Sequence, residues 1–144
     1  MKGSLLLTVA IAGFAGCANP TAIDFGSKPI QTPGTFHCFR DQLVVKVERA
    51  PEGKLDYSVG NKKVAAGPGK PALRERDPWV IFPEAADRVW IFDGAKDVTL
   101  IEISTEGASK FTSSQVVPDI LIRAPAEFRR LLPADLAGEH GPKS

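Results

Sequence analysis

The chain has 144 residues, of which 43% are hydrophobic, and this is enough apolar material for the core of one domain. Its 18 Lys and Arg residues nearly balance its 17 Asp and Glu residues, so it lacks the basic excess that neutralises phosphates, and we expect no nucleic-acid partner. The 13 Gly and 12 Pro residues indicate many turns and argue against a helical bundle.

The first residues have the pattern of an export leader. Lys2 gives the chain a positive start, and residues 5–15 form an uninterrupted run without charge. This run is too short to cross a bilayer core of about 30 Å as a helix, and its length is typical of the apolar region of a signal peptide. We therefore predict that residues 1–16 are a signal peptide.

The end of the leader, Phe14-Ala15-Gly16-Cys17, resembles the lipobox of bacterial lipoproteins. In that family, cleavage leaves the cysteine at the new N-terminus, its thiol takes a diacylglycerol and its amine takes a third acyl chain. The resemblance implies lipidation of Cys17 and a membrane anchor, with no other cofactor. Ala18 is not the aspartate that retains such proteins in the inner membrane, which implies an outer-membrane lipoprotein facing the periplasm. Secretion, with cleavage before Asn19, is the alternative.

Residues 17–35 are predicted to form a flexible tether. They contain Asn-Pro, Lys-Pro and Thr-Pro-Gly sequences and few apolar residues, so they bury too little surface to offset the entropy of ordering. Ile23 and Phe25 are the exceptions, because they have the character of an edge strand that docks on the domain.

Residues 36–117 are predicted to form a β domain that begins with a hairpin. Leu43, Val45 and Val47 alternate with polar residues in the segment 42–49, which is the pattern of a half-buried strand. The segment 54–60 alternates in the same way after a Pro- and Gly-containing turn. Residues 62–66 are expected to add a further short strand.

Three consecutive strands are predicted between Trp79 and Ile103, over residues 79–82, 89–92 and 97–103. The first two runs are apolar at successive positions, which indicates central strands that are covered on both faces. Asp93-Gly94 between the second and third runs is a hairpin-turn signal. A last strand is predicted over residues 110–117.

Residues 118–144 are predicted to be a C-terminal helix and tail packed on the β domain. Pro125 stands at an expected first helical position and Pro133 at an expected stop, and Phe128, Leu131 and Leu132 would face the sheet. The fold class is therefore all-β and mainly antiparallel, a small β-sandwich in preference to a barrel-like domain, with one short C-terminal helix.

Few residues of the chain are suited to metal binding or nucleophilic catalysis. The only His and Cys residues are His37, His140, Cys17 and Cys38, and neighbours such as His37 and Cys38 point to opposite faces of a strand. We expect no metal site, and we interpret Cys38 as a small buried hydrophobic residue. If Cys17 is lipidated, Cys38 is either a free thiol or part of an intermolecular disulfide.

Carboxylates near the predicted turns are candidates for hydrolytic chemistry. Glu84, Asp87 and Asp93 would supply the acid and base of a small hydrolase, with Asp97 close to the same turns. Aspartates at such positions more often bond to the backbone of a turn, and this is the favoured interpretation.

A recognition patch is a further hypothesis. Trp79 and Trp90, with Arg76 and Arg88 nearby, are residue types enriched at interface hot spots. Core tryptophans flanked by solvated arginines are the favoured alternative.

The expected function is a membrane-anchored, non-catalytic binding or scaffolding module of the cell envelope, with a protein partner. The first alternative is an inhibitor or chaperone-like partner of another envelope protein, acting through the loop 67–77 or a sheet edge. The second alternative is a small envelope hydrolase that uses the loop carboxylates.

Overall fold

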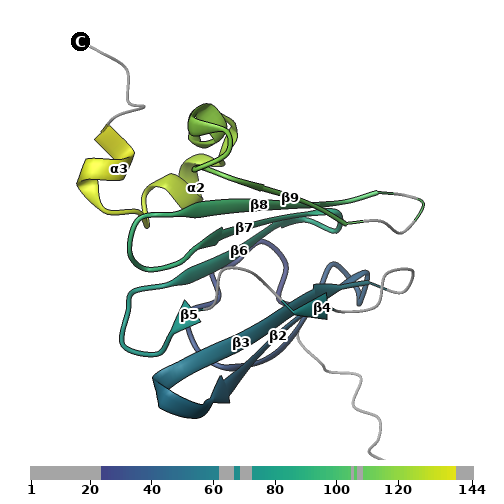
Figure 1. The fold of residues 1–144 in the computed structure, drawn as a ribbon. Helices are drawn as coiled ribbons and strands as arrows, with labels where there is room; N and C mark the ends of the chain where they lie inside the picture. Colours follow the sequence, from purple (N-terminus) through teal and green to yellow (C-terminus); the bar gives the residue numbers. More distant parts are fainter. Residues whose placement is uncertain (1–23, 62–66, 69–72, 105, 107–108, 139–144) are drawn as a thin grey trace, which may run out of the picture.

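The computed structural model describes residues 24–61, 67–68, 73–104, 106 and 109–138, which form two antiparallel sheets and four short helical segments, the first of them the 3-10 helix η2 (Pro51–Gly53) (Figure 1). The predicted all-β, antiparallel class is confirmed. The preference for a sandwich over a barrel stays a prediction. The leader, Cys17, His140 and the strand predicted over residues 62–66 lie outside the described residues.

The N-terminal sheet has the order β1-β2-β3-β4, with β5 also paired to β3. Its strands are β1 (Gly34–Cys38), β2 (Leu43–Ala50), β3 (Lys54–Gly60), β4 (Gly67–Pro68) and β5 (Leu73–Arg74). The C-terminal sheet has the order β6-β7-β8-β9. Its strands are β6 (Val80–Ala85), β7 (Arg88–Phe92), β8 (Val98–Ile103) and β9 (Ser109–Ser113).

The N-terminal sheet buries one face. In β2, Leu43, Val45 and Val47 are buried, whereas Lys46 and Glu48 are exposed. The register places Val45 opposite Val59 and Val47 opposite Tyr57, so the apolar residues of the predicted hairpin share a face. The alternation therefore predicted this hairpin correctly.

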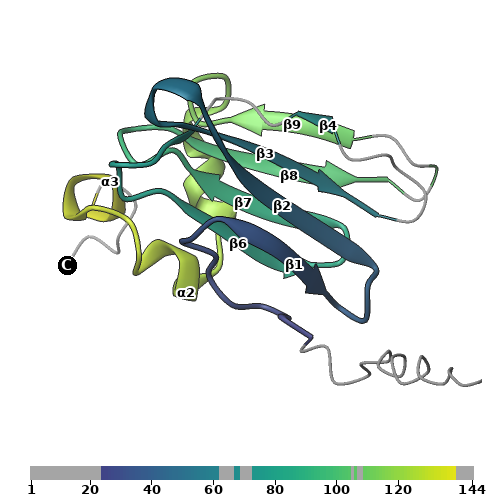
Figure 2. The ribbon, with the colours of Figure 1, turned by 90° about the horizontal axis from the view of Figure 1, so that it is seen from below.

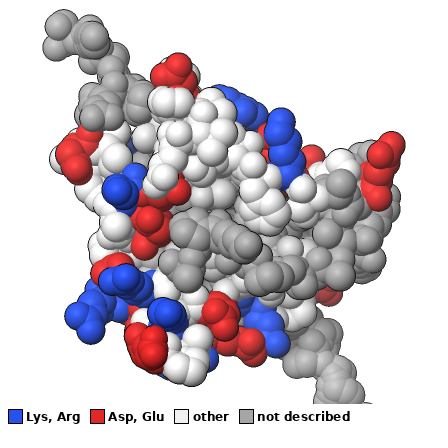
Figure 3. Space-filling view, in the orientation of Figure 1, with Lys and Arg blue, Asp and Glu red and all other residues white. Residues whose placement is uncertain are grey.

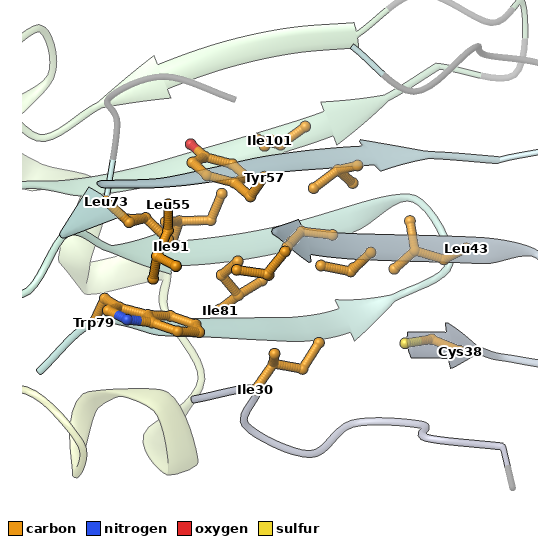
Figure 4. Packing of buried hydrophobic residues seen from close by; sticks show 14 of the residues in the cluster. Ile30, Cys38, Leu43, Leu55, Tyr57, Leu73, Trp79, Ile81, Ile91 and Ile101 are labelled. Atoms are coloured by element: carbon orange, nitrogen blue, oxygen red, sulfur yellow. The ribbon is translucent and has the colours of Figure 1, made fainter. Parts of the chain in front are cut away.

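Strands β6, β7 and β8 of the C-terminal sheet are buried on both faces, as the continuous apolar runs of the first two predicted, whereas the edge strand β9 has no buried residue. Ile81, Val89, Ile91, Ile101 and Ile103 belong to an inner core that they share with the N-terminal sheet (Figure 4). The residues between them belong to an outer core with the helical segments: Val80, Phe82, Trp90, Phe92, Val98 and Leu100. The molecule thus has three layers, with the C-terminal helical segments on the far side of the C-terminal sheet (Figures 1 and 2).

The C-terminal region contains more helical segments than the one predicted helix. They are the 3-10 helix η3 (Pro118–Arg123), α2 (Ala126–Arg129) and α3 (Ala134–Gly138). Pro125 is the extended residue before α2 rather than its first helical residue, and Pro133 separates α2 from α3. Phe128 and Leu132 enter the outer core as predicted, but Leu131 is 37% exposed, so its expected contact with the sheet was wrong. Within the described residues, no helix has the length and apolar character needed to span a membrane.

The last strand is shorter than predicted. It ends at Ser113, and the Ser113 carbonyl accepts hydrogen bonds from the amides of Val116 and Val117, which turn the chain toward η3. The loop predicted over residues 67–77 is also tied down where it is described. β4 and β5 both pair with β3, and Leu73 is fully buried, because an apolar side chain at this point closes the inner core.

The domain begins earlier than the predicted boundary at residue 36. Within the segment expected to be a tether, Ile30 is 1% exposed and forms an antiparallel bridge with Ile81, and Gly34 and Thr35 belong to β1. Phe25 packs against the inner core, in line with the docking expected of it. Phe25 and Ile30 dock the described part of this segment on the domain because two sheet edges are available to receive it.

Candidate functional site

The predicted patch of Arg76, Trp79, Arg88 and Trp90 does not form at the surface. Trp79 is 4% exposed and belongs to the inner core, whereas Trp90 is 0% exposed and belongs to the outer core. The two indoles therefore lie on opposite faces of the C-terminal sheet. The favoured alternative, core tryptophans with arginines nearer the solvent, is the one that the structure bears out.

A charged network surrounds the Trp90 indole at the end of the outer core. The indole N–H donates to Glu84 Oε2 over 2.6 Å, and Glu84 Oε1 lies 3.6 Å from Arg88 Nη1. Arg88 Nη2 lies 3.5 Å from Glu102 Oε2. The other carboxylate oxygen of Glu102, Oε1, lies 3.6 Å from Arg123 Nη2. The network gives a buried donor its acceptor, and this accounts for Glu84 and Arg88 without catalysis.

A surface depression of about 390 Å³ lies beside this network, at the end of the C-terminal sheet. It is lined by Asp87, Arg88, Glu102, Ile103, Ser104, Ser109 and Lys110. Within the described residues, no ion pair is found for Asp87 or Lys110, while Arg88 and Glu102 already neutralise each other. The lining carries both signs of charge and hydroxyl groups, so it suits a polar ligand better than an apolar one.

The loop from Asp93 to Asp97 is held by its own side chains. Asp93 Oδ1 accepts from the amides of Ala95, Lys96 and Asp97 over 2.7, 2.9 and 3.1 Å. A side chain at Gly94, where φ is 89°, would approach the Cβ of Asp77 to 2.7 Å. The interpretation of Asp93-Gly94 as turn residues is confirmed.

The carboxylates proposed for hydrolysis are spread along β7. Glu84 pairs with Arg88 at the start of β7 and Asp93 follows its end, five residue steps from Arg88, or about 16 Å at the usual rise of a strand. Both carboxylates also have their own partners, the Trp90 indole and the loop amides. The structure does not bring Glu84 and Asp93 to one place.

Cys38 and His37 point to opposite faces of β1, as their adjacency predicted. Cys38 is fully buried in the inner core, which confirms its interpretation as a buried hydrophobic residue. Burial, with a smaller contribution from the Asp24 charge, raises the pKa of the Cys38 thiol from 9.0 to about 11. His37 is exposed, and its Nδ1 lies 2.9 Å from Asp41 Oδ1. Among the described residues, no group of three or more His, Cys, Asp or Glu side chains could hold a metal ion.

Exposed apolar side chains follow β9, and sequence reasoning missed them. Val116, Val117 and Ile122, here called the apolar ridge, are 76%, 43% and 62% exposed. A depression of about 280 Å³ lies beside them, lined by Lys96, Val98, Ser114, Gln115, Pro118, Leu121 and Leu136. The sequence pattern places the two valines in the predicted last strand, where alternation would bury one of them. Pro118 immediately afterwards is the signal that the strand pattern had ended.

Charged side chains gather at the end of the molecule that carries the β2–β3 hairpin (Figure 3), and others, Asp119 and Arg123, are exposed in η3 near Ile122 of the apolar ridge. Figure 3 shows side chains of both signs gathered at the lower end, where the β2–β3 hairpin lies in Figure 1, and an uncharged area in the upper half. Arg49 and Glu75, which join β2 to the segment after β5 over 2.6 Å, belong to the charged end.

Comparisons with known proteins identify no relative. No protein-family model matches the chain, and neither the curated proteins nor the solved structures contain a match.

Proposed function

We propose that this protein is a lipoprotein of the cell envelope, anchored through Cys17, that acts as a non-catalytic module binding another protein. The anchor is supported by the export leader and by the lipobox-like residues that end at Cys17. Outer-membrane attachment facing the periplasm is the proposed location, with secretion as the alternative.

The single observation that carries the binding role is the apolar ridge. Three aliphatic side chains between residues 116 and 122 are each more than 40% exposed, although the same region buries Ile120 and Leu121. Isolated exposed apolar residues are ordinary, but several on one short segment favour a protein contact. The ridge lies on the layer farthest from the N-terminal sheet, to which the tether leads.

Site-specific photo-crosslinking in intact envelopes tests the binding role. A photo-reactive amino acid replaces Val116 in one variant and Lys46, on the exposed face of the N-terminal sheet, in a matched control. The proposal expects one discrete protein adduct at position 116 and none at position 46. No adduct at either position, or the same adducts at both, would contradict it.

Fractionation of envelopes tests the anchor separately. The chain with Cys17→Ala is expected to leave the membrane fraction and still to form the crosslink at position 116 when the two fractions are recombined. Unchanged membrane fractionation of Cys17→Ala would refute lipidation at this residue without affecting the binding role.

A further inference from the structure

Residues 24–30, here called the strap, join the free edges of the two sheets. At one end, the amide of Phe25 donates to the carbonyl of His37 in β1 over 2.9 Å, and the Phe25 ring packs edge-on against Phe36 with centroids 4.9 Å apart. At the other end, Ile30 exchanges two backbone hydrogen bonds with Ile81 in β6, over 2.7 and 3.0 Å. The strap therefore pairs with the outer edge of β6, where the N–H and C=O of Ile81 would otherwise have no backbone partner.

Asp24, the first residue of the strap, holds the turn between β1 and β2. Its Oδ1 accepts from the amide of Phe39 over 2.7 Å and from the amide of Gly26 over 3.1 Å. Its Oδ2 accepts from the amide of Arg40 over 3.1 Å. Hydrogen bonds from amides to a carboxylate are stronger than those between neutral groups.

The turn that Asp24 holds is strained. Phe39, Arg40 and Asp41 have φ values of 54°, 57° and 64°, so three successive residues with a Cβ are in the left-handed region. Each such residue is unfavourable by itself, because its Cβ approaches the following carbonyl oxygen. A run of three persists only where surrounding contacts stabilise it, and the two oxygens of Asp24 bind the first two amides of the run.

We propose that the strap is a latch, a segment that opens as a unit while the rest of the domain stays folded. Asp24 is its catch, the residue whose hydrogen bonds hold the strap closed. Opening relaxes the turn between β1 and β2 and uncovers β1 and the β6 edge. This inference does not depend on the apolar ridge. Among the described residues, Asp24 is the first in the chain, and its hydrogen bonds to Phe39 and Arg40 are the most N-terminal of the contacts that hold the strap to β1 and its turn.

Two probes report opening at the two ends of the strap. The thiol of Cys38 is fully buried in the inner core, against which Phe25, Phe36 and Phe39 pack, and it reacts as the thiolate, so a thiol reagent should modify it only after opening. The Ile81 amide donates to Ile30 and exchanges with solvent once that bond is broken. The Trp90 amide in β7, which is paired on both sides, reports global unfolding.

The experiment compares Asp24→Ala with Asp56→Ala in the full chain carrying Cys17→Ala, so that Cys38 is the only thiol. Asp56 is an exposed aspartate of β3 that makes no contact with the strap among the hydrogen bonds and ion pairs found for the described residues. Asp24→Ala is expected to raise both Cys38 labelling and Ile81 exchange roughly tenfold, because three charge-assisted bonds are lost. Exchange at Trp90 should rise by no more than the same factor and stay far slower than exchange at Ile81, because global unfolding breaks the same Asp24 bonds, and Asp56→Ala should change all three rates less than twofold.

Arg40→Gly provides a second test that does not weaken the fold. Glycine adopts a φ of 57° without steric cost, so this variant should label more slowly at Cys38 than the parent. In the Arg40→Gly background, Asp24→Ala should raise labelling by less than in the parent, because less strain is left for Asp24 to restrain.

Three results would overturn the latch. Equal free energies of opening from exchange at Ile81 and at Trp90 in the parent would mean that the strap opens only when the whole domain unfolds. An increase at only one end would mean that the strap does not open as a unit. Unchanged rates at both ends would mean that Asp24 is not the catch.

Discussion

The two sheets use similar apolar side chains but bury them differently. The N-terminal sheet covers one face and leaves Lys46, Glu48 and Asp56 exposed on the other, whereas the C-terminal sheet is covered by its partner sheet on one face and by helical segments on the other. The number of covered faces determines how a substitution on the outward face acts. On the first sheet such a residue touches water, and on the second it belongs to a core.

Truncation of an outward-facing side chain should show the largest difference in stability effect between the two sheets. Trp90→Ala, on the outer face of the C-terminal sheet, is expected to lower the free energy of unfolding by about 3–5 kcal/mol, as large-to-small core changes do. Lys46→Ala, on the outer face of the N-terminal sheet, should change it by less than about 0.5 kcal/mol. Urea unfolding of both variants gives the comparison, and similar losses would show that the faces are equivalent.

The Glu84–Trp90 hydrogen bond is a smaller feature of the same outer core. Glu84→Ala leaves the buried indole N–H without an acceptor and should lower the free energy of unfolding by about 1–3 kcal/mol. Glu84→Gln keeps an acceptor oxygen and is expected to lose less. If urea unfolding shows equal losses for the two variants, the charge of Glu84 matters more than the hydrogen bond.

Alkaline pH should weaken the inner core. Burial raises the pKa of Cys38 from 9.0 to about 11, and burial with the charges of Asp93 and Asp97 raises the pKa of Tyr57. In the unfolded chain both groups lose their protons at lower pH than in the native one. The stability that their neutral forms confer is therefore complete below about pH 9 and is lost as pH rises.

The Cys38 contribution can be isolated by measuring urea midpoints between pH 8 and pH 10.5. The fall in midpoint across this range should be shallower for Cys38→Ala than for the parent, since Cys38→Ala removes one of the two groups. Identical pH dependence in both proteins would show that the Cys38 thiol has an ordinary pKa in the native state.

The smallest expected effect lies on the exposed face of the N-terminal sheet. Glu48 and Asp56 are directly opposite each other on β2 and β3, and like charges at such a pair are unfavourable. Asp56→Asn should therefore raise the free energy of unfolding by a few tenths of a kcal/mol, and the gain should fall as salt is added. A loss of stability would show that Lys46, which lies 3.0 Å from Glu48, already compensates the pair.

Sequence reasoning succeeded where the determining pattern was local. The alternation in β2 and β3, the continuous apolar runs of β6 and β7 and the Asp93-Gly94 turn were all predicted. It failed at Val116 and Val117, where an apolar pair looked like the end of a strand, and at Leu131, whose neighbours are buried. It also placed Ile30 in the tether, because a single isoleucine among Pro and polar residues gives no periodic signal.

Of the candidate site residues, the sequence placed Trp79, Trp90, Arg88 and Glu84 close together in the chain but did not determine which would meet. Glu84 meets Trp90 and Arg88 because it lies in β6 at the irregularity where the pairing with β7 shifts register, between Pro83 and Ala85. Trp79 belongs to the other core, on the opposite face of the sheet. Glu102 and Arg123 join the network from β8 and η3, and nothing in the local sequence around Glu84 indicated them.

By itself, the sequence determined an all-β class, the positions of most strands and the number of faces that each strand buries. These follow from the spacing of apolar residues two positions apart, which needs no knowledge of the rest of the chain. Only the tertiary structure decided which edges the strap occupies, why a left-handed turn is held by an aspartate fifteen residues earlier, and which apolar residues stay exposed after β9. Those outcomes depend on contacts between segments distant in sequence, whose free energies no local pattern records.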